Sequence, residues 1–435
     1  MIDKKRSRLK GQHVVIIGNG IAGNSALSAI RSFDSDAKVT LISEEEYPLY
    51  SPCAFYKYLA GEMERRRLFL KTVDDYSREK IGVVFGHKVS EVDVKARKVF
   101  VEYSPIHFDH LILATGSRAL FPPINGIEKR GVFALKTMSD AESILNYPAK
   151  KVLIVGSGPI GIESAIAFRK RGLEVSVIEI LDRVLPRLFD DTPAGICRKT
   201  LEDRGIEILT EERVIEILGD ESVTGVATDK HEIPCDMVVM GAGVNPNTEL
   251  ARAIGLDIGT LGGIRADDFM LTNVEGIYAC GDCIEAKDIV TRESTLSLLW
   301  ANAKRQGWTA GCNCVGERRR FPGSFDATVI EMYGTYAVCA GKGTAYIENR
   351  DGCEVIEGMS DQGYYRLIIL DNSLVGMQMI DTSEHAGFFF SKMLRKDDVK
   401  ELRRIALNDK LLSVRHWNYL VSKYMTPGGR LFLDD

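Results

Sequence analysis

A succession of strand, glycine loop and helix occurs twice in this chain and constrains its fold more than any other feature. The run His13 to Ile17 leads into Gly18-Asn19-Gly20-Ile21-Ala22-Gly23, and Lys151 to Val155 leads into Gly156-Ser157-Gly158-Pro159-Ile160-Gly161. An amphipathic helix and a second β-branched strand, ending near Ile42 or Ile178, follow each loop. The repetition predicts two βαβ units, each within a parallel sheet.

The spacing of the glycines indicates nucleotide binding. The first glycine of each loop (Gly18, Gly156) makes the tight turn, and the third (Gly23, Gly161) permits close helix packing. The second (Gly20, Gly158) lets the backbone approach a pyrophosphate, which meets unpaired N–H groups at the positive end of the helix. Glycine turns also occur without a ligand, but the strand before each loop and the helix after it favour two bound dinucleotides.

A carboxylate that binds the ribose is expected about 20 residues after such a loop. Glu179 ends the second strand of the second unit. Because its charge would repel a 2'-phosphate, we expect NADH to be preferred over NADPH. The first unit has the acidic turn Ser43-Glu44-Glu45-Glu46 at this place, where we predict Glu44; the alternative is that the turn is merely solvated.

Both halves continue to a further apolar strand that ends in small residues, Leu111 to Gly116 and Met237 to Gly243. After Gly323 the pattern changes to strand-like runs at Thr328 to Glu331, Tyr365 to Leu370 and Leu374 to Ile380, and then to a helical pattern from about Asp397. We therefore predict an α/β protein with two Rossmann-like dinucleotide-binding domains, residues 1–120 with 245–321 and residues 121–244. An α+β C-terminal domain, residues 322–435, follows them.

Composition excludes several other classes. The net charge of −5 gives no attraction to nucleic acid, and no apolar run is long enough for a membrane helix. The basic start, Lys4-Lys5-Arg6, lacks the apolar region of a signal peptide, and nine scattered cysteines suit a reducing compartment. We expect a cytoplasmic protein in which most cysteines are small buried side chains. The pairs Cys280-x2-Cys283 and Cys312-x-Cys314 have metal-like spacing, but we predict no metal site, and no histidine has ligand spacing.

Three further segments, together with the glycine loops, resemble the pyridine nucleotide-disulfide oxidoreductases. Phe108 to Gly116 is similar to the family's "yDxLvxATG" segment, Asp236 to Asn247 to "DxVvxxxGxxPN", and Gly276 to Asp282 to "giYAxGD". The resemblance implies that the first domain binds FAD and the second NAD, and that the C-terminal domain serves dimerisation and covers the active site. It assigns Asp282 to the ribityl chain of FAD. The predicted cofactor-binding residues are Gly18, Gly20, Ile21, Ala22, Gly23, Glu44, Thr115, Gly116, Gly281 and Asp282 for FAD, and Gly156, Gly158, Pro159, Ile160, Gly161, Glu179 and Gly243 for NAD.

The resemblance also implies an FAD-dependent NAD(P)H oxidoreductase that passes electrons to a second acceptor. Glu163 would lie near the flavin and the nicotinamide and pair with Lys57, although Tyr56 takes the aligned place in some relatives. The dithiol branch of the family is excluded, because Cys53 is followed five residues later by Tyr58 and not by a second cysteine.

Two branches remain open. In the single-cysteine branch, which includes NADH oxidases and coenzyme A-disulfide reductases, Cys53 would be a redox thiolate with a lowered pKa that reduces a disulfide or polysulfide. Ile21 stands where the peroxidases and oxidases of this branch carry a histidine, which counts against peroxide or oxygen. The other branch comprises ferredoxin-reductase-like proteins, whose corresponding segment Tyr50 to Gly61 resembles. In this branch Cys53 would only fill space, and the acceptor would be an iron–sulfur protein or a partner subunit. We favour the first, with Cys53, Lys57 and Glu163 as predicted catalytic residues; an inactive nucleotide-binding scaffold is the third alternative.

Overall fold

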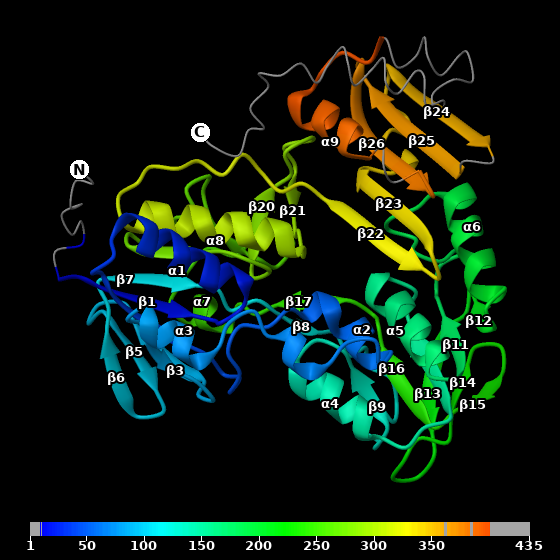
Figure 1. The fold of residues 1–435 in the computed structure, drawn as a ribbon, viewed down its shortest axis with the longest axis horizontal. Helices are drawn as coiled ribbons and strands as arrows, with labels where there is room; N and C mark the ends of the chain where they lie inside the picture. Colours follow the sequence, from blue (N-terminus) through cyan, green and yellow to red (C-terminus); the bar gives the residue numbers. More distant parts are fainter. Residues whose placement is uncertain (1–8, 10, 361–362, 383–385, 401–435) are drawn as a thin grey trace. The chain divides into compact units, whose positions relative to one another are not determined.

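The structure, a computed structural model, describes residues 9, 11–360, 363–382 and 386–400 (Figure 1). They form two compact units: Met1–Leu181 with Arg204–Asp326, and Asp182–Asp203 with Ala327–Asp435, each for its described part. The basic start of the chain, His385, His416 and the pattern beyond residue 400 lie outside the described residues. The predicted boundaries of three domains stay a prediction.

A five-stranded parallel sheet contains the first glycine loop. Its strand β1 is buried along its whole length, as is typical of strands covered on both faces of a parallel sheet. In spatial order the strands are β19 (Ile277–Ala279), β7 (His110–Leu113), β1 (His13–Ile17), β2 (Lys38–Ile42) and β3 (Gly82–Val84). The last strand to join, β19, comes from far along the chain and brings the "giYAxGD" segment beside the first glycine loop.

A second parallel sheet repeats this arrangement. Its strands are, in spatial order, β9 (Val132–Ala134), β16 (Met237–Met240), β10 (Lys151–Val155), β11 (Glu174–Ile178) and β12 (Ile206–Leu209). The order matches that of the first sheet, with the glycine-loop strand in the centre of each. The predicted duplication and the α/β fold class are therefore confirmed.

Two helices pack against each other over the first sheet, α1 (Ile21–Phe33) and α8 (Trp300–Cys314), which run side by side in Figure 1. A Cβ added to Gly307 would lie 2.0 Å from the carbonyl oxygen of Ala22, and one on Gly311 would lie 2.3 Å from that of Ala26. Only glycine permits this approach, so α8 is fixed directly over the helix that follows the glycine loop.

The remaining elements of this unit are short. One three-stranded antiparallel sheet (β4, β5, β6) follows β3 and another (β13, β14, β15) follows β12, and the antiparallel pair of β8 and β17 links the two halves. In chain order these elements are η1 (Pro52–Ala54), α2 (Phe55–Leu59), η2 (Arg65–Leu68), α3 (Val73–Arg78), β4 (Val89–Asp93), β5 (Lys98–Val101), β6 (Ser104–His107), β8 (Ser117–Ala119), α4 (Met138–Asn146), α5 (Pro159–Lys170), β13 (Val214–Leu218), β14 (Gly225–Thr228), β15 (Glu232–Pro234), β17 (Val244–Pro246), α7 (Glu249–Ala253), β18 (Ile264–Arg265), β20 (Ile284–Lys287) and β21 (Ser294–Thr295).

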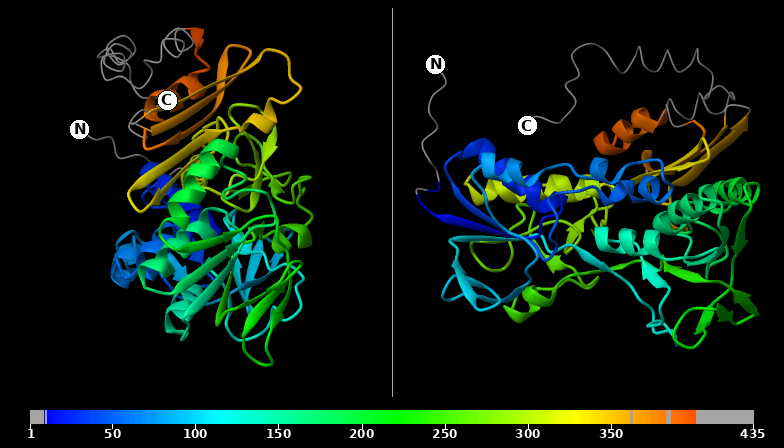
Figure 2. Two further views of the ribbon diagram at one scale, coloured as in Figure 1. Left: turned by 90° about the vertical axis from the view of Figure 1, so that its right-hand side faces the viewer. Right: turned by 60° about the horizontal axis from the view of Figure 1, so that its bottom comes forward.

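The other unit is built on a five-stranded antiparallel sheet that has α9 on one face (Figures 1 and 2). The strands are, in spatial order, β22 (Ala327–Met332), β23 (Thr335–Gly341), β26 (Ser373–Ile380), β25 (Gly363–Leu370) and β24 (Cys353–Ser360). Helix α6 (Asp191–Glu202) contacts β22 and β26, and the 3₁₀ helix η3 (Thr344–Tyr346) follows β23.

The predicted α+β C-terminal domain is thus confirmed as a fold, with two differences. The strands β23 and β24 were not expected. The helix α9 (Ala386–Arg395) was not expected either, and the helical pattern from about Asp397 stays a prediction, since only its first residues, to the helical Lys400, are described. Within the described ranges, no helix combines the length and apolar character needed to cross a bilayer. The cytoplasmic location stays a prediction.

Candidate functional site

The first glycine loop is closely packed except at its middle glycine. A Cβ on Gly18 would lie 2.0 Å from the carbonyl oxygen of Ala114, and one on Gly23 would lie 2.0 Å from that of Gly18. A Cβ on Gly20 would meet nothing within 4 Å. Helix α1 begins after Gly20 without a side-chain cap, so its first N–H groups are available to a phosphate. The open backbone at Gly20 therefore fits a pyrophosphate.

The second loop has the same construction. A Cβ on Gly161 would lie 2.1 Å from the carbonyl oxygen of Gly156, which itself approaches Gly241, whereas Gly158 faces open space. Pro159 is the first residue of α5, a position where the missing proline N–H leaves no unpaired donor. The partly exposed Ile160 follows it. Both loops thus offer the same backbone surface to a dinucleotide.

Glu179 is held at the end of β11 by the second loop itself. Its Oε2 accepts hydrogen bonds from the backbone N–H of Ser157 at 2.9 Å and from the Ser157 hydroxyl at 2.7 Å. Its Oε1 accepts from the N–H of Leu181 at 3.0 Å, and the side chain is buried. The carboxylate is therefore fixed beside the loop, as a ribose-binding group requires.

The acidic turn of the first unit divides its carboxylates between two environments. Glu44 is exposed, with its Oε1 3.8 Å from Nζ of Lys88, so it is free to face a ribose. Glu45 points inward and accepts the hydroxyl of Tyr50 at 2.7 Å, and burial raises the pKa of this carboxyl. Glu44 remains the predicted ribose-binding residue.

Thr115 and Gly116 are hydrogen-bonded to Asn247, at the point where the chain leaves the second parallel sheet. The Thr115 hydroxyl donates to the carbonyl of Asn247 at 2.7 Å, and the Asn247 amide donates back to the carbonyl of Thr115 at 2.9 Å. The backbone N–H of Asn247 also donates to Gly116. Gly243 has a positive φ of 107° and accepts the N–H of Leu120 at the same crossing. The two predicted segments therefore meet where the halves join.

Asp282 follows β19 and lies in a polar cluster. Its Oδ2 accepts the hydroxyl of Ser117 at 2.9 Å and forms an ion pair with Nζ of Lys136 at 3.1 Å. The preceding Gly281 donates its N–H to the buried Oε1 of Gln306 on α8 at 2.9 Å. Within the described chain, no hydrogen bond uses Oδ1 of Asp282, which leaves this oxygen for a cofactor hydroxyl.

Cys53 lies in η1 with its side chain exposed. Burial of its sulfur in the surrounding chain raises the pKa of the Cys53 thiol, and the negative charges of Glu163 and Asp282 raise it further. The expectation of a lowered pKa is therefore wrong for the protein chain by itself, because the nearby charges are negative.

Glu163 lies on α5 with its carboxyl withdrawn from solvent, and burial raises its pKa to about 7. Lys57 lies on α2, where its Nζ is 5.6 Å from the centre of the Tyr56 ring. In the ranges that the structure describes, no ion pair joins Lys57 to Glu163, so the expected pairing is wrong. At neutral pH the carboxyl of Glu163 is therefore partly protonated and partly charged.

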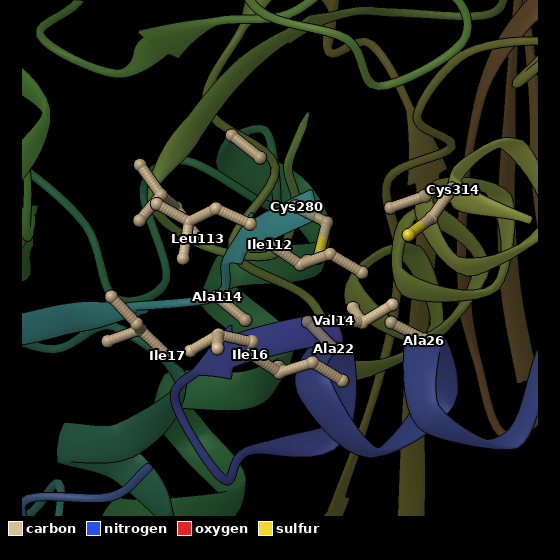
Figure 3. Packing of buried hydrophobic residues seen from close by; sticks show 14 of the residues in the cluster. Val14, Ile16, Ile17, Ala22, Ala26, Ile112, Leu113, Ala114, Cys280 and Cys314 are labelled. Carbon is tan, nitrogen blue, oxygen red and sulfur yellow. The ribbon is translucent and has the colours of Figure 1, made fainter. Parts of the chain in front are cut away.

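The cysteines of the two suggestive pairs belong to the core. Cys280 and Cys314 lie in the apolar cluster around β1, β7 and α1 (Figure 3), and Cys283 and Cys312 are also fully buried. The Cys283 thiol donates to the carbonyl of Cys280 at 3.3 Å. Seven of the nine cysteines are buried, as expected, and the exposed ones are Cys53 and Cys353. No group of three or more potential metal ligands occurs among the described residues, and the absence of a metal site stays a prediction.

Sequence reasoning missed four residues of this site: Ser117, Lys136, Asn247 as a bridging residue, and Gln306. Ser117 and Asn247 lie beside recognised motifs and could have been found from them. Lys136 contacts Asp282, which lies 146 residues away in sequence. Gln306 contacts Gly281, which lies 25 residues away. Nothing in the local pattern around either of them indicates that contact.

Two glycine-loop sheets with a fixed carboxylate at the end of one strand define a protein that binds two dinucleotides. The profile of the family described as "Pyridine nucleotide-disulphide oxidoreductase" matches residues 12–307. The chain belongs to this family. It is an oxidoreductase with FAD and NAD(H) as cofactors, and it transfers electrons between NAD(H) and its flavin.

Named relatives agree with this class. An NADH oxidase of Methanocaldococcus jannaschii is 38% identical over 319 residues, 71% of each chain. An NAD(P)H sulfur oxidoreductase (CoA-dependent) of Pyrococcus abyssi is 33% identical over 327 residues, 73% of each chain. Among solved structures, an NAD-dependent persulfide reductase from A. fulgidus superposes with a TM-score of 0.84 at 28% identity, covering 90% of this chain and 78% of that one.

Proposed function

We propose that this enzyme uses two electrons from NADH to reduce a small disulfide or polysulfide, and that Cys53 is the side chain that reacts with the sulfur acceptor. The observation that carries the proposal is the exposure of the Cys53 side chain, whose thiol interacts electrostatically with the carboxyl groups of Glu163 and Asp282. Two relatives whose names specify sulfur or persulfide reduction support the choice of acceptor.

The chemistry on Cys53 would be a thiol–disulfide exchange. The Cys53 thiolate attacks one sulfur of the acceptor, the S–S bond breaks, and the leaving sulfur takes up a proton. The first glycine loop and Asp282 would hold FAD, whose chemistry would be to pass two electrons from NADH, so that the mixed disulfide on Cys53 would return to the thiolate and a second thiol. NADH, one proton and one disulfide thus give NAD⁺ and two thiols.

Glu163 would supply the proton in this exchange. Its carboxyl has a pKa of about 7, so at neutral pH a part of it is protonated and can release a proton to a leaving sulfur. The Glu179 carboxylate beside the second glycine loop would select NADH. The 2'-phosphate of NADPH would place further negative charge next to this buried carboxylate and be repelled by it.

The test separates the two half-reactions. We expect purified wild-type protein to be yellow and to be bleached by NADH without oxygen. Cys53→Ser should be bleached at the wild-type rate, since hydride transfer does not involve the thiol, and its re-oxidation by polysulfide should be slowed by at least about 100-fold. Stopped-flow absorbance of the flavin measures both steps, and Cys353→Ser, which removes the other exposed cysteine, is the matched control.

An alternative acceptor would show itself in the same experiment. If Cys53→Ser is re-oxidised by polysulfide as fast as wild type, Cys53 only fills space and sulfur reduction is not its function. An iron–sulfur protein that re-oxidises wild type and Cys53→Ser equally well would then be the better acceptor.

A further inference from the structure

The turn that carries Cys53, residues 50–55, is closed by aromatic rings at both of its ends. Tyr50 precedes the 3₁₀ helix η1 and Phe55 follows it, and their ring centres lie 5.6 Å apart at an interplanar angle of 30°. The ring of Phe69 meets that of Tyr50 edge-on at 6.3 Å, and the two residues also form an isolated antiparallel β-bridge. Stacked and edge-on pairs stabilise beyond the apolar area that they bury. The position of Tyr50 therefore determines the position of the Cys53 turn.

The hydroxyl of Tyr50 connects this turn to the half of the chain that is built on the second parallel sheet. It accepts the backbone N–H of Met138 at 3.2 Å and donates to Oε2 of Glu45 at 2.7 Å. Met138 is the first residue of α4, where a backbone N–H has no partner within its own helix. Burial and the Glu45 carboxylate raise the pKa of Tyr50, so the hydroxyl keeps its proton at neutral pH. One hydroxyl thus pairs with an N–H at the start of α4 and with a carboxyl of the acidic turn.

The residues after the turn are attached to the same half. Helix α2, which follows η1 directly, contacts both α4 and α5. Beyond it, Glu62 forms an ion pair at 2.8 Å with Nζ of Lys170 on α5. This pair is partly exposed to solvent and contributes little. The hydroxyl of Tyr50, by contrast, is half-buried and lies three residues from Cys53 along the chain.

We propose that the hydroxyl of Tyr50 positions Cys53 for its reaction with the sulfur acceptor, by tying the Cys53 turn to the start of α4. Tyr50 is a positioning residue that acts through the backbone of the turn and takes no part in bond making. Thiol–disulfide exchange needs an aligned thiolate, and a displacement of about 1 Å can cost about 100-fold in rate. The inference rests on the role proposed above for Cys53.

Tyr50→Phe tests the hydroxyl while it keeps the ring. FAD-loaded protein is reduced by NADH without oxygen and then re-oxidised by polysulfide, and stopped-flow absorbance of the flavin follows both steps. We expect re-oxidation to slow by about five-fold or more, and bleaching by NADH to keep the wild-type rate. A merely structural role would not separate the two half-reactions in this way.

Amide hydrogen exchange measures the attachment of the turn directly. In Tyr50→Phe the backbone N–H of Met138 loses its acceptor, so exchange in the peptide that contains residues 50–55 should accelerate by about three-fold or more. Exchange in β1 should stay unchanged, which shows that the variant keeps its fold.

Two further variants serve as controls. Glu45→Gln retains an oxygen that can accept the hydroxyl of Tyr50, and it should match wild type in both measurements. Tyr364→Phe is the matched control, because it removes a tyrosine hydroxyl that donates to Glu357 at 3.0 Å in the other compact unit. It should change neither the half-reactions nor exchange at residues 50–55.

Three results would overturn the proposal. Re-oxidation of Tyr50→Phe by polysulfide at the wild-type rate would show that the hydroxyl does not position Cys53. Equal slowing of bleaching would show that it acts on the whole flavin site. Unchanged exchange at residues 50–55 would show that it does not hold the turn. The exchange measurement involves no acceptor, so its failure is distinct from a failure of the Cys53→Ser test above.

Discussion

At the scale of single residues, the site combines a buried carboxyl group that has no counter-ion among the described residues with a carboxylate that has one. Glu163 is withdrawn from solvent without an ion-pair partner in the described chain, and burial raises its pKa. Asp282 has Lys136 and Ser117 as partners. Sequence motifs predict which acidic residues belong to the site. Only the fold determines which of these residues has a counter-ion.

The pH dependence of stability should reveal the buried carboxyl. Because the pKa of Glu163 is raised from 4.5 to about 7, the folded protein binds more protons than the unfolded chain in this interval. The free energy of unfolding should therefore fall as pH rises from about 4.5 to about 7, by at most about 3 kcal/mol relative to Glu163→Gln. Urea unfolding of the flavin-free proteins measures this, with the exposed Glu216→Gln as control. Parallel curves for wild type and Glu163→Gln would contradict it.

At the scale of elements, the sequence predicts strands well where burial is continuous. The strands beside the glycine loops are unbroken apolar runs, and they lie where expected. Edge strand β24 was missed because Glu354, Glu357 and Gly358 interrupt its apolar alternation. Helix α9 was missed, although Phe388, Phe389 and Met393 have helical spacing and are buried. A short or half-polar hydrophobic pattern therefore does not identify a strand or helix unless the elements that pack against it are known.

The glycine loop and β11 act together in choosing the nicotinamide cofactor. Replacing Glu179 by alanine removes the acceptor of the Ser157 and Leu181 N–H groups and the charge that opposes a 2'-phosphate. We expect kcat/KM for NADH to fall by about ten-fold or more, and the preference for NADH over NADPH to shrink. Glu207→Ala is the control, since Glu207 also accepts a serine hydroxyl, that of Ser176 at 2.7 Å, but on the neighbouring strand. Wild-type protein that uses NADPH as well as NADH would show that Glu179 does not select the cofactor.

At the scale of the whole molecule, the chain leaves the first compact unit after Leu181 and returns at Arg204. The segment between these two points, residues 182–203, contains α6. Nothing in its sequence distinguishes it from the predicted NAD-binding domain, residues 121–244. Polar contacts attach this segment to the rest of the second unit. The N–H of Asp190 donates to the buried Oε1 of Gln378 at 3.0 Å, and the Asp190 carboxylate accepts a hydrogen bond from the N–H of Thr344. These partners are more than 150 residues apart in sequence, so local periodicity cannot indicate them.

Arg366 is the centre of this network and gives its most direct test. Its guanidinium pairs with Asp190 at 3.1 Å and with Glu357 at 2.6 Å while only 12% exposed, and its hydrogen bond holds the pKa of the Glu357 carboxyl below the ordinary value. Arg366→Met would leave two carboxylates without their counter-ion, which costs about 2 kcal/mol at such partly buried positions. Amide hydrogen exchange in α6 and β25 should then accelerate by about ten-fold or more, while exchange in β10 stays unchanged. Arg198→Met, which breaks an exposed pair with Glu202 on α6, should change exchange little. Equal acceleration in β10 would mean that the two units open together, and residues 182–203 would then not belong to a separately stable part of the fold.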